Sequence, residues 1–250
     1  MPGPRARYPV VLLDVGGTIV GPETSFGSIY ASVLSGLGLT VDDAEIERSI
    51  HETWREMNRV IPPGSDRYRH FPGGEDEYWL RFTRATLTHA LGRPPVDGVA
   101  APALAGIRRA FLEPGAWRVF ADVRPALARL RAAGIRLAVV SNWDSNLPRV
   151  LGMLGLAPYF EAVVISHVEG VEKPHPELFR RALARIGATA DQALHVGDVP
   201  ELDLAGAAAA GIDAVLVDRH RRFDATLRPI PDLSALPRIV RHGLAREPRG

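Results

Sequence analysis

The stretch Val10-Val-Leu-Leu-Asp14-Val-Gly-Gly-Thr18 contains an apolar run that ends abruptly in polar and flexible residues. Its first four residues are apolar and partly β-branched, which is typical of a short buried strand. An acidic residue, two glycines and a threonine follow, and glycine-rich segments of this kind form tight loops. The sequence therefore predicts a buried strand that ends in a loop carrying Asp14.

The chain from residue 116 onward alternates between strand-like and helix-like segments. Strands are predicted at 135–140, 162–165, 193–196 and 214–217, and helices at 125–133, 146–154, 176–186 and 203–210. Strands that alternate with helices of this length favour an α/β fold with a doubly wound, parallel, Rossmann-like sheet. The arginine- and proline-rich segment after Asp218 is interpreted only as a surface extension.

The segment between these parts has a different pattern, with apolar residues at helical spacing. Examples are Phe26, Ile29, Tyr30, Val33, Leu34 and Leu37, followed by Ile46, Ile50, Trp54 and Met57. No strand is predicted there, so the segment is interpreted as an all-helical insert. The predicted organisation is an α/β core made of residues 1–20 and 116–250, with a helical domain at 21–115.

Polar residues gather at the predicted strand ends. They are Asp14 with Gly16, Gly17 and Thr18, then Ser141 and Asn142, then Asp198 and Asp203, while Lys173 follows the strand at 162–165. In a doubly wound sheet, ligands bind outside the carboxyl ends of the strands. We therefore expect these side chains to converge at one edge of the sheet.

This set of residues fits phosphoryl chemistry. A carboxylate such as Asp14 can attack phosphorus and form an aspartyl-phosphate, and Mg²⁺ accepts carboxylates such as Asp14 and Asp198 as ligands. Lys173 is the single lysine among 30 basic residues, and its compact charge suits a carboxylate and a phosphoryl oxygen. A structural alternative remains for each residue: Asp14 is a turn former, and Asp203 is predicted to cap the helix that follows it.

Composition limits the remaining classes of function. The net charge is +1, which does not favour non-specific electrostatic binding to nucleic acid. The chain has no cysteine, which excludes disulfides and thiolate chemistry. Residues 1–9 are not followed by a signal-peptide pattern and no apolar run reaches membrane-spanning length, so a cytoplasmic protein without a membrane partner is expected.

Four motifs in order resemble those of the haloacid dehalogenase superfamily. They are Val10-Val-Leu-Leu-Asp14-Val-Gly-Gly-Thr18, Leu137-Ala-Val-Val-Ser141-Asn142, Glu172-Lys173-Pro174 and Gly197-Asp198 followed by Asp203. The resemblance covers the chain to about Asp218 and implies a Rossmann-like core with a helical (C1-type) cap. It also implies a Mg²⁺-dependent phosphatase that acts on a small phosphorylated molecule.

The resemblance assigns a role to each matching residue. It makes Asp14 the nucleophile and Lys173 its catalytic partner, with Asp14, Asp198 and the backbone carbonyl of Gly16 on the metal. Phosphate would be bound by Gly17, Thr18, Ser141, Asn142 and Lys173. Asp203 would support the metal site without binding the ion directly. In the cap, Arg67, Arg69 and His70 are the candidate substrate-recognition residues. The sequence does not predict an oligomeric state.

The chain departs from the family pattern at Gly16, where phosphatases carry the aspartate that acts as general acid and base. Such catalysis contributes about 10²–10⁴-fold in rate, so a slower phosphatase is expected, one that favours good leaving groups. Asp144 or a cap residue is a candidate replacement. Gly197-Asp198 counts against a metal-free dehalogenase, and a cap without lysine excludes a Schiff-base mechanism. The alternative is a catalytically silent relative that binds a phosphorylated ligand or partner.

Overall fold

The structure is a computed structural model that describes residues 6–244. The chain forms two compact units: one combines the residues up to Gly21 with those from Val119 onward, and the other is Pro22–Arg118. Strands β2 (Val20–Pro22) and β3 (Trp117–Val119) lie where the chain passes between the units. They hydrogen-bond to each other as a two-stranded sheet.

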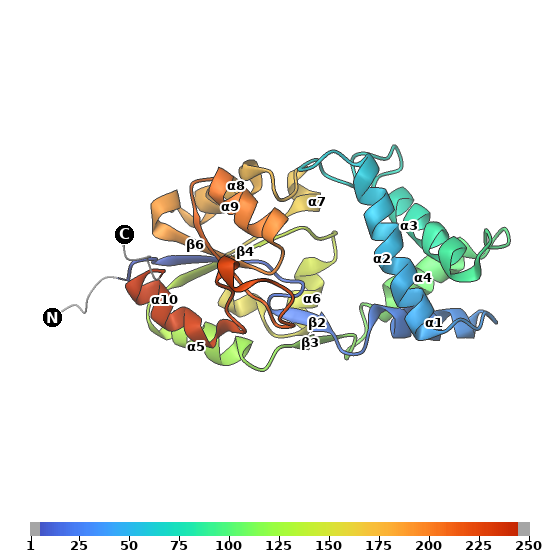
Figure 1. The fold of residues 1–250 in the computed structure, drawn as a ribbon, viewed down its shortest axis with the longest axis horizontal. Helices are drawn as coiled ribbons and strands as arrows, with labels where there is room; N and C mark the ends of the chain where they lie inside the picture. The colour runs from blue at the N-terminus through green and yellow to red at the C-terminus, as the bar shows by residue number, and fades with distance from the viewer. Residues whose placement is uncertain (1–5, 245–250) are drawn as a thin grey trace. The chain divides into compact units, whose positions relative to one another are not determined.

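The first unit contains a five-stranded parallel sheet in the order β5-β4-β1-β6-β7 (Figure 1). Its strands are β1 (Val10–Leu13), β4 (Arg136–Ser141), β5 (Ala162–Ile165), β6 (Ala193–Gly197) and β7 (Asp213–Leu216). The strand β1 is central, and its register pairs Leu13 with Val139 of β4 and Val196 of β6. The carboxyl ends of these three strands therefore lie side by side, and the predicted doubly wound α/β fold is confirmed.

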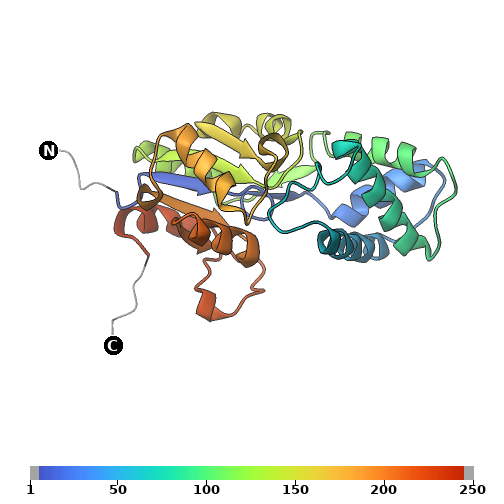
Figure 2. The ribbon, with the colours of Figure 1, turned by 90° about the horizontal axis from the view of Figure 1, so that it is seen from above.

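Helices cover both faces of this sheet (Figures 1 and 2). They are α5 (Val123–Ala132), α6 (Leu147–Met153), α7 (Ser166–Glu169), α8 (Pro176–Ile186), α9 (Ala205–Ala209) and α10 (Leu236–His242). The helices α8 and α9 lie on one face, and α5 with α10 on the other (Figure 1). Successive strand residues point to opposite faces, so a strand covered on both faces is apolar throughout. That is the reason why all four residues of β1 are apolar and buried.

The second unit contains four helices, α1 (Phe26–Gly36), α2 (Asp43–Val60), α3 (Gly74–Leu91) and α4 (Ala100–Ala110). Their apolar faces meet in a core that includes the buried rings of Tyr30, Tyr78 and Phe82. Trp54 packs on this core from its edge, with its ring centroid 5.1 Å from that of Phe82. The helical spacing seen in the sequence therefore reflects burial within this unit.

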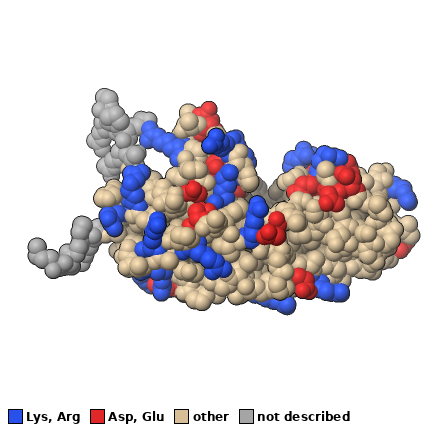
Figure 3. Space-filling model, turned by 90° about the horizontal axis from the view of Figure 1, so that it is seen from below, with Lys and Arg blue, Asp and Glu red and all other residues tan. Residues whose placement is uncertain are grey.

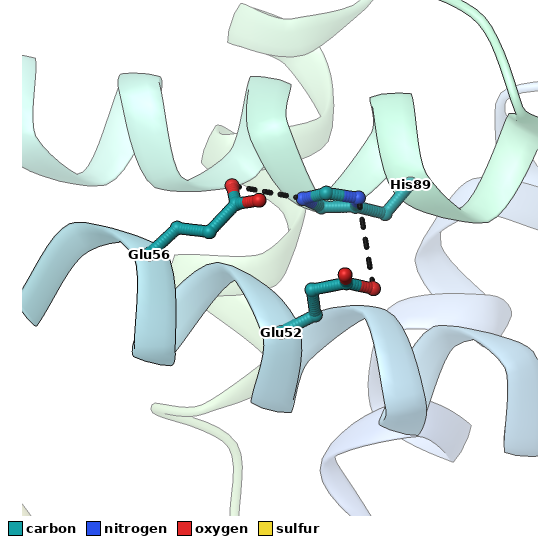
Figure 4. Close-up of side chains that lie close together, drawn as sticks. All are labelled: Glu52, Glu56 and His89. Carbon is teal, nitrogen blue, oxygen red and sulfur yellow. Dashed lines mark hydrogen bonds and ion pairs between the residues drawn. The ribbon is translucent and has the colours of Figure 1, made fainter. Parts of the chain in front are cut away.

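A cluster of three polar side chains joins α2 to α3 on the surface of the helical unit (Figure 4). The ring of His89 lies between two carboxylates, with Nε2 3.1 Å from Glu56 and Nδ1 3.8 Å from Glu52. The carboxylates are about half exposed, and exposed pairs of this kind contribute only about 0.2–1 kcal/mol to stability. The apolar core between the helices therefore holds the unit together.

The segment after Asp218 is part of the α/β unit, so its interpretation as a surface extension is wrong. Val217 bridges to Ile230, and Leu233, Leu236 and Val240 are buried. Helix α10 packs against α5, which completes one face of the sheet. The apolar residues are spread among arginines and prolines, so the sequence shows no helical or strand periodicity long enough to reveal them. Residues 245–250 lie outside the described part of the chain.

Basic and acidic side chains are interspersed on the face of the molecule drawn in Figure 3, in keeping with a net charge of +1. Among residues 6–244, no helix has both the length and the apolar character that crossing a lipid bilayer requires.

Candidate active site

Asp14 lies directly beyond the last residue of β1, at the carboxyl edge of the sheet. Its backbone N–H donates to the carbonyl of Val196 at 2.9 Å, which extends the pairing of β1 with β6 by one residue. The residue is 7% exposed, and its Oδ1 accepts hydrogen bonds from Ser141 at 2.9 Å and Lys173 at 2.8 Å. No described residue donates to Oδ2, so the two oxygens of this carboxylate have different surroundings.

Lys173 is buried between two carboxylates. It is 2% exposed, and its Nζ lies 2.8 Å from Asp14 Oδ1 and 2.6 Å from Asp203 Oδ1. Burial alone would lower the pKa of Lys173, but the charges and hydrogen bonds of these two carboxylates outweigh it and raise the pKa above its usual value. The ammonium group therefore stays charged and neutralises part of the acidic cluster.

Asn142 holds the backbone of Lys173 from both sides. Its Oδ1 accepts the Lys173 N–H at 2.7 Å, and its Nδ2 donates to the Lys173 carbonyl at 3.0 Å. The amide of Asn142 is therefore committed to positioning Lys173. If Asn142 contacts phosphate, it therefore does so through its backbone.

Asp203 is the most deeply buried acid of the cluster, with 1% of its surface exposed. Its carboxylate accepts hydrogen bonds from Lys173, from His195 Nε2 at 2.9 Å and from the backbone N–H of Val199 at 2.9 Å. Burial would raise the pKa of Asp203, but Lys173 and His195 hold it well below its usual range. Because Asp203 is thus an acceptor only, His195 Nε2 carries the proton of this bond.

The prediction that Asp203 caps the following helix is wrong. Asp203 lies inside a π-helical turn, Pro200–Leu204, which precedes α9, and its side chain points into the acidic cluster. The backbone N–H that it accepts belongs to Val199, ahead of the turn. Spacing alone does not distinguish a cap from a buried carboxylate, because both place an acid near a helix start.

Asp198 follows β6 and faces the loop after Asp14. Its Oδ1 accepts the hydroxyl of Thr18 at 3.3 Å, and a Cβ placed on Gly17 would lie 2.3 Å from its Oδ2. Gly17 also has a φ of +74°, so both the backbone and the close approach of Asp198 require glycine. Burial and the charge of Asp203 raise the pKa of Asp198, and Arg222 opposes this effect.

The carboxylates of Asp14, Asp198 and Asp203 form one cluster, in which an oxygen of each lies within 4.8 Å of the other two. Burial raises the pKa of Asp14 to about 6; Lys173 opposes this rise, and the charges of Asp203 and Asp198 add to it. Asp14 is therefore mostly ionised at neutral pH. A hard cation with oxygen ligands fits these residues, because it would offset the surplus negative charge.

Two arginines of the segment after β7 hold the loops of the site, and the sequence interpretation missed both. Arg222 donates to the side chain and the backbone carbonyl of Asp198, at 3.2 Å each. Arg219 donates to the carbonyl of Thr18 at 2.7 Å and forms a two-pronged ion pair with Asp122 at 2.8 and 3.0 Å. Nothing in the local sequence distinguishes them from the other arginines of an arginine-rich segment.

We expect Asp122→Ala to lower the free energy of unfolding by about 3 kcal/mol, because removing one partner of a mostly buried pair strands the other charge. The side chains of Asp122 and Arg219 are only 15% and 10% exposed, and the backbone N–H of Leu233 would also lose its acceptor. Thermal denaturation measures the loss as a fall in Tm of about 6–12 °C. The exposed Asp97→Ala is the control, with a change within about 0.5 kcal/mol.

The ion pair of Asp122 with Arg219 should make the free energy of unfolding depend on pH. Burial raises the pKa of Asp122, but the hydrogen bonds from Arg219 and Leu233 outweigh it and lower the pKa. Stabilisation by an acid with a lowered pKa is complete above the unfolded value, about 3.9, and is lost as pH falls through the folded one. The difference in free energy of unfolding between the wild type and Asp122→Ala should therefore become smaller below about pH 4. An equal difference at pH 3 and pH 7 would contradict the ion-pair explanation.

The other candidate residues lie as follows. Asp144, a proposed replacement acid, accepts the backbone N–H of Asn146 at 2.9 Å in the turn before α6. Within the helical unit, Arg67 is buried with its guanidinium 4.8 Å from the ring centroid of Trp54. Arg69 is exposed and pairs with Asp66 at 3.5 Å, and the exposed ring of His70 meets Phe71 edge-on. Arg67 therefore has a structural role in its own unit.

The fold and the site define a class of α/β proteins. Their parallel sheet is interrupted after its first strand by a helical unit, and an acidic cluster with one lysine lies at the carboxyl edge of the sheet. The model of the haloacid dehalogenase-like hydrolase family matches residues 8–211, and the chain belongs to that family. The resemblance inferred from the four motifs is thereby confirmed.

Individual relatives agree with this assignment. The chain is 28% identical to mouse haloacid dehalogenase-like hydrolase domain-containing protein 3, over 94% of this chain and 92% of that protein. It is 30% identical to glyceraldehyde 3-phosphate phosphatase of Methanopyrus kandleri, over 86% of this chain and 85% of that protein. The structure of the HAD-hydrolase YfnB from Bacillus subtilis shares the fold, with a TM-score of 0.72 at 22% identity, covering 94% of this chain and 99% of that one.

Proposed function

We propose that the protein is a Mg²⁺-dependent phosphohydrolase that hydrolyses a small phosphorylated molecule through an aspartyl-phosphate on Asp14. The observation that carries the proposal is the contact of Asp14 with Lys173 and Ser141 at the end of β1. Both donors bind the same oxygen, so the carboxylate is oriented before any substrate arrives. Phosphatases among the relatives, including the enzyme of Methanopyrus kandleri, support this class of substrate.

In this proposal Asp14, Asp198 and the backbone carbonyl of Gly16 hold the metal ion. The ion supplies positive charge that reduces the repulsion between the nucleophile and the phosphate. The magnesium-bound structure of YfnB, which has the same fold, supports this choice of ion. Asp203 stays outside the metal shell in this scheme, because its carboxylate already accepts three hydrogen bonds.

The remaining groups act on the phosphoryl group directly. Lys173 and the hydroxyl of Ser141 stabilise charge on its oxygens, as do backbone N–H groups of the loop around Gly17 and Thr18. The P–O bond to the leaving group breaks as the bond to Asp14 forms, and water then cleaves the aspartyl-phosphate to release inorganic phosphate. Since Lys173 stays charged and fixed, its stabilisation needs no rearrangement during the reaction.

A second candidate function is binding of a phosphorylated ligand or partner without turnover. Gly16 favours it, because this position cannot donate a proton to the leaving group. In that case phosphate would raise the Tm in the presence of Mg²⁺, and no substrate would be hydrolysed.

The direct test is phosphate release from p-nitrophenyl phosphate and a panel of phosphorylated metabolites, with Mg²⁺ or with EDTA. We expect turnover with Mg²⁺ and a loss of at least about 10²-fold in EDTA, because the metal stabilises several kcal/mol of charge in the transition state. Restoring Mg²⁺ should restore the rate. Equal rates in both conditions would contradict the metal requirement, and no turnover on any substrate would favour the binding function.

A further inference from the structure

The ring of Trp143 lies against the backbone of Gly16. A Cβ placed on residue 16 would be 3.3 Å from Cζ3 and 4.0 Å from Cε3 of this ring. Carbon atoms in good contact are about 3.5–4.0 Å apart, so a side chain at position 16 would press on the indole. The glycine and the tryptophan are therefore matched to each other.

Trp143 is held by its backbone on both sides. Its N–H donates to the hydroxyl of Ser166 at 3.2 Å, and its carbonyl accepts from that hydroxyl at 3.3 Å and from the N–H of His167 at 3.4 Å. Ser166 is fully buried. Asn142, the residue before Trp143, accepts a hydrogen bond from the backbone N–H of Lys173. The ring is thus positioned by the same loop that positions the lysine.

Trp143 and Gly16 belong to the two loops that carry Ser141 and the candidate nucleophile, Asp14. Trp143 is two residues beyond Ser141, which donates to Asp14, and Gly16 is two residues beyond Asp14 itself. Trp143 and Gly16 are both only partly buried. An indole presents a flat apolar face, and its N–H does not act as an acid. This part of the site can therefore contact a leaving group but cannot protonate it.

We infer that Gly16 and Trp143 form a leaving-group subsite that selects aryl phosphates, in which a flat ring carries a weakly basic leaving oxygen. This inference rests on the proposed function and narrows its substrate class. The carboxylate of Asp14 forms a bond to phosphorus, and the bond from phosphorus to the leaving oxygen breaks with its electron pair on that oxygen. Water then attacks the phosphorus, which regenerates Asp14 and yields phosphate, and the departed phenolate takes a proton from solvent.

The two properties of the leaving group have separate physical reasons. Without an acid to protonate it, the leaving oxygen departs as an anion. A phenolate is a stable leaving anion because its negative charge is delocalised into the ring. The ring itself gains by packing on the indole, since aromatic pairs add binding energy beyond the area that they bury. A weakly basic leaving oxygen and a ring should therefore each raise kcat/KM, which reports substrate binding and formation of the aspartyl-phosphate. Hydrolysis of the aspartyl-phosphate is the same step for every substrate.

Four substrates separate these properties in the wild-type enzyme with Mg²⁺. p-Nitrophenyl phosphate has a ring and a weakly basic leaving oxygen, and acetyl phosphate has the same kind of oxygen without a ring. Benzyl phosphate has a ring and a strongly basic oxygen, and ethyl phosphate has neither feature. We expect the weakly basic pair to exceed the other pair in kcat/KM by about 10²–10⁴-fold, the contribution of a missing general acid.

Variants at the two positions test the subsite itself. Trp143→Ala should lower kcat/KM for the ring-bearing substrates roughly twofold to tenfold more than for the ringless ones, and Trp143→Phe should retain most of the preference. The double variant Gly16→Asp/Trp143→Ala, which gains an acid and the space for it, should narrow the difference in kcat/KM between benzyl and p-nitrophenyl phosphate. Circular dichroism and thermal denaturation establish that each variant is folded.

Three outcomes would overturn a claim. No phosphate release from any of the four substrates by the wild type would overturn the proposed function. The same kcat/KM for benzyl phosphate as for p-nitrophenyl phosphate would overturn the leaving-group inference alone. An equal fall of all four kcat/KM values in Trp143→Ala would show that the ring supports the loop and does not contact the leaving group.

Discussion

Asp14→Asn is expected to reduce Mg²⁺-dependent phosphate release by on the order of 10³-fold or more, because the amide cannot form the aspartyl-phosphate. The same variant should be at least as stable as the wild type when Mg²⁺ is removed with EDTA. Three carboxylates share the cluster with one buried ammonium, and burial raises the pKa of Asp14 to about 6. Removing one negative charge therefore relieves repulsion in the folded state.

The sign of the stability effect follows from the direction of the pKa shift. An acid whose folded pKa is raised makes the folded state less favourable as pH rises from the unfolded value, about 3.9, through the folded value. The stability gain of Asp14→Asn should therefore be present at pH 7 and disappear toward pH 4. Thermal denaturation with EDTA measures it at both pH values.

An exposed aspartate gives the matched control for this experiment. Asp97→Asn makes the same chemical change outside the site, and both activity and Tm should stay at wild-type values. A large loss of Tm in Asp14→Asn, or phosphate release at the wild-type rate, would contradict the role proposed for Asp14.

The fold was predictable because its signals are local. Apolar runs such as 162–165 and the helical spacing of 176–186 coincide with the observed β5 and α8. The cluster of acids and lysine was predictable for a topological reason, since parallel strands place residues such as Asp14 and Asp198 at one edge of the sheet. Neither step requires knowledge of a particular side-chain contact.

The contacts that tune the site were not predictable, because they depend on the path of the chain in space. Arg219 is 201 residues away from Thr18, whose carbonyl it binds, and 97 residues away from Asp122. Trp143 follows a recognisable motif, yet only the structure brings its ring against Gly16. The sequence shows a glycine at position 16, and the structure identifies which side chain lies against it.

Lys173→Met should have the largest effect on stability, a loss of about 3–5 kcal/mol, together with the loss of phosphate release. The substitution removes the ammonium from between Asp14 and Asp203 and leaves both carboxylates buried without it, which is the costly way to break a buried ion pair. The backbone of residue 173 stays bound to Asn142, so the loop keeps its anchor. For a chain of this size the fall in Tm is about 6–20 °C.

A double-mutant cycle separates this electrostatic effect from a simple packing defect. If the lost stability comes from stranded negative charge, Asp14→Asn should be more stabilising in the Lys173→Met background than in the wild type, with a coupling of about 0.5–3 kcal/mol. The exposed Asp97→Asn should show no coupling with Lys173→Met. Strict additivity of Asp14→Asn and Lys173→Met in EDTA would mean that the 2.8 Å contact contributes no energy, and Lys173 would then have no role in holding the charge of Asp14.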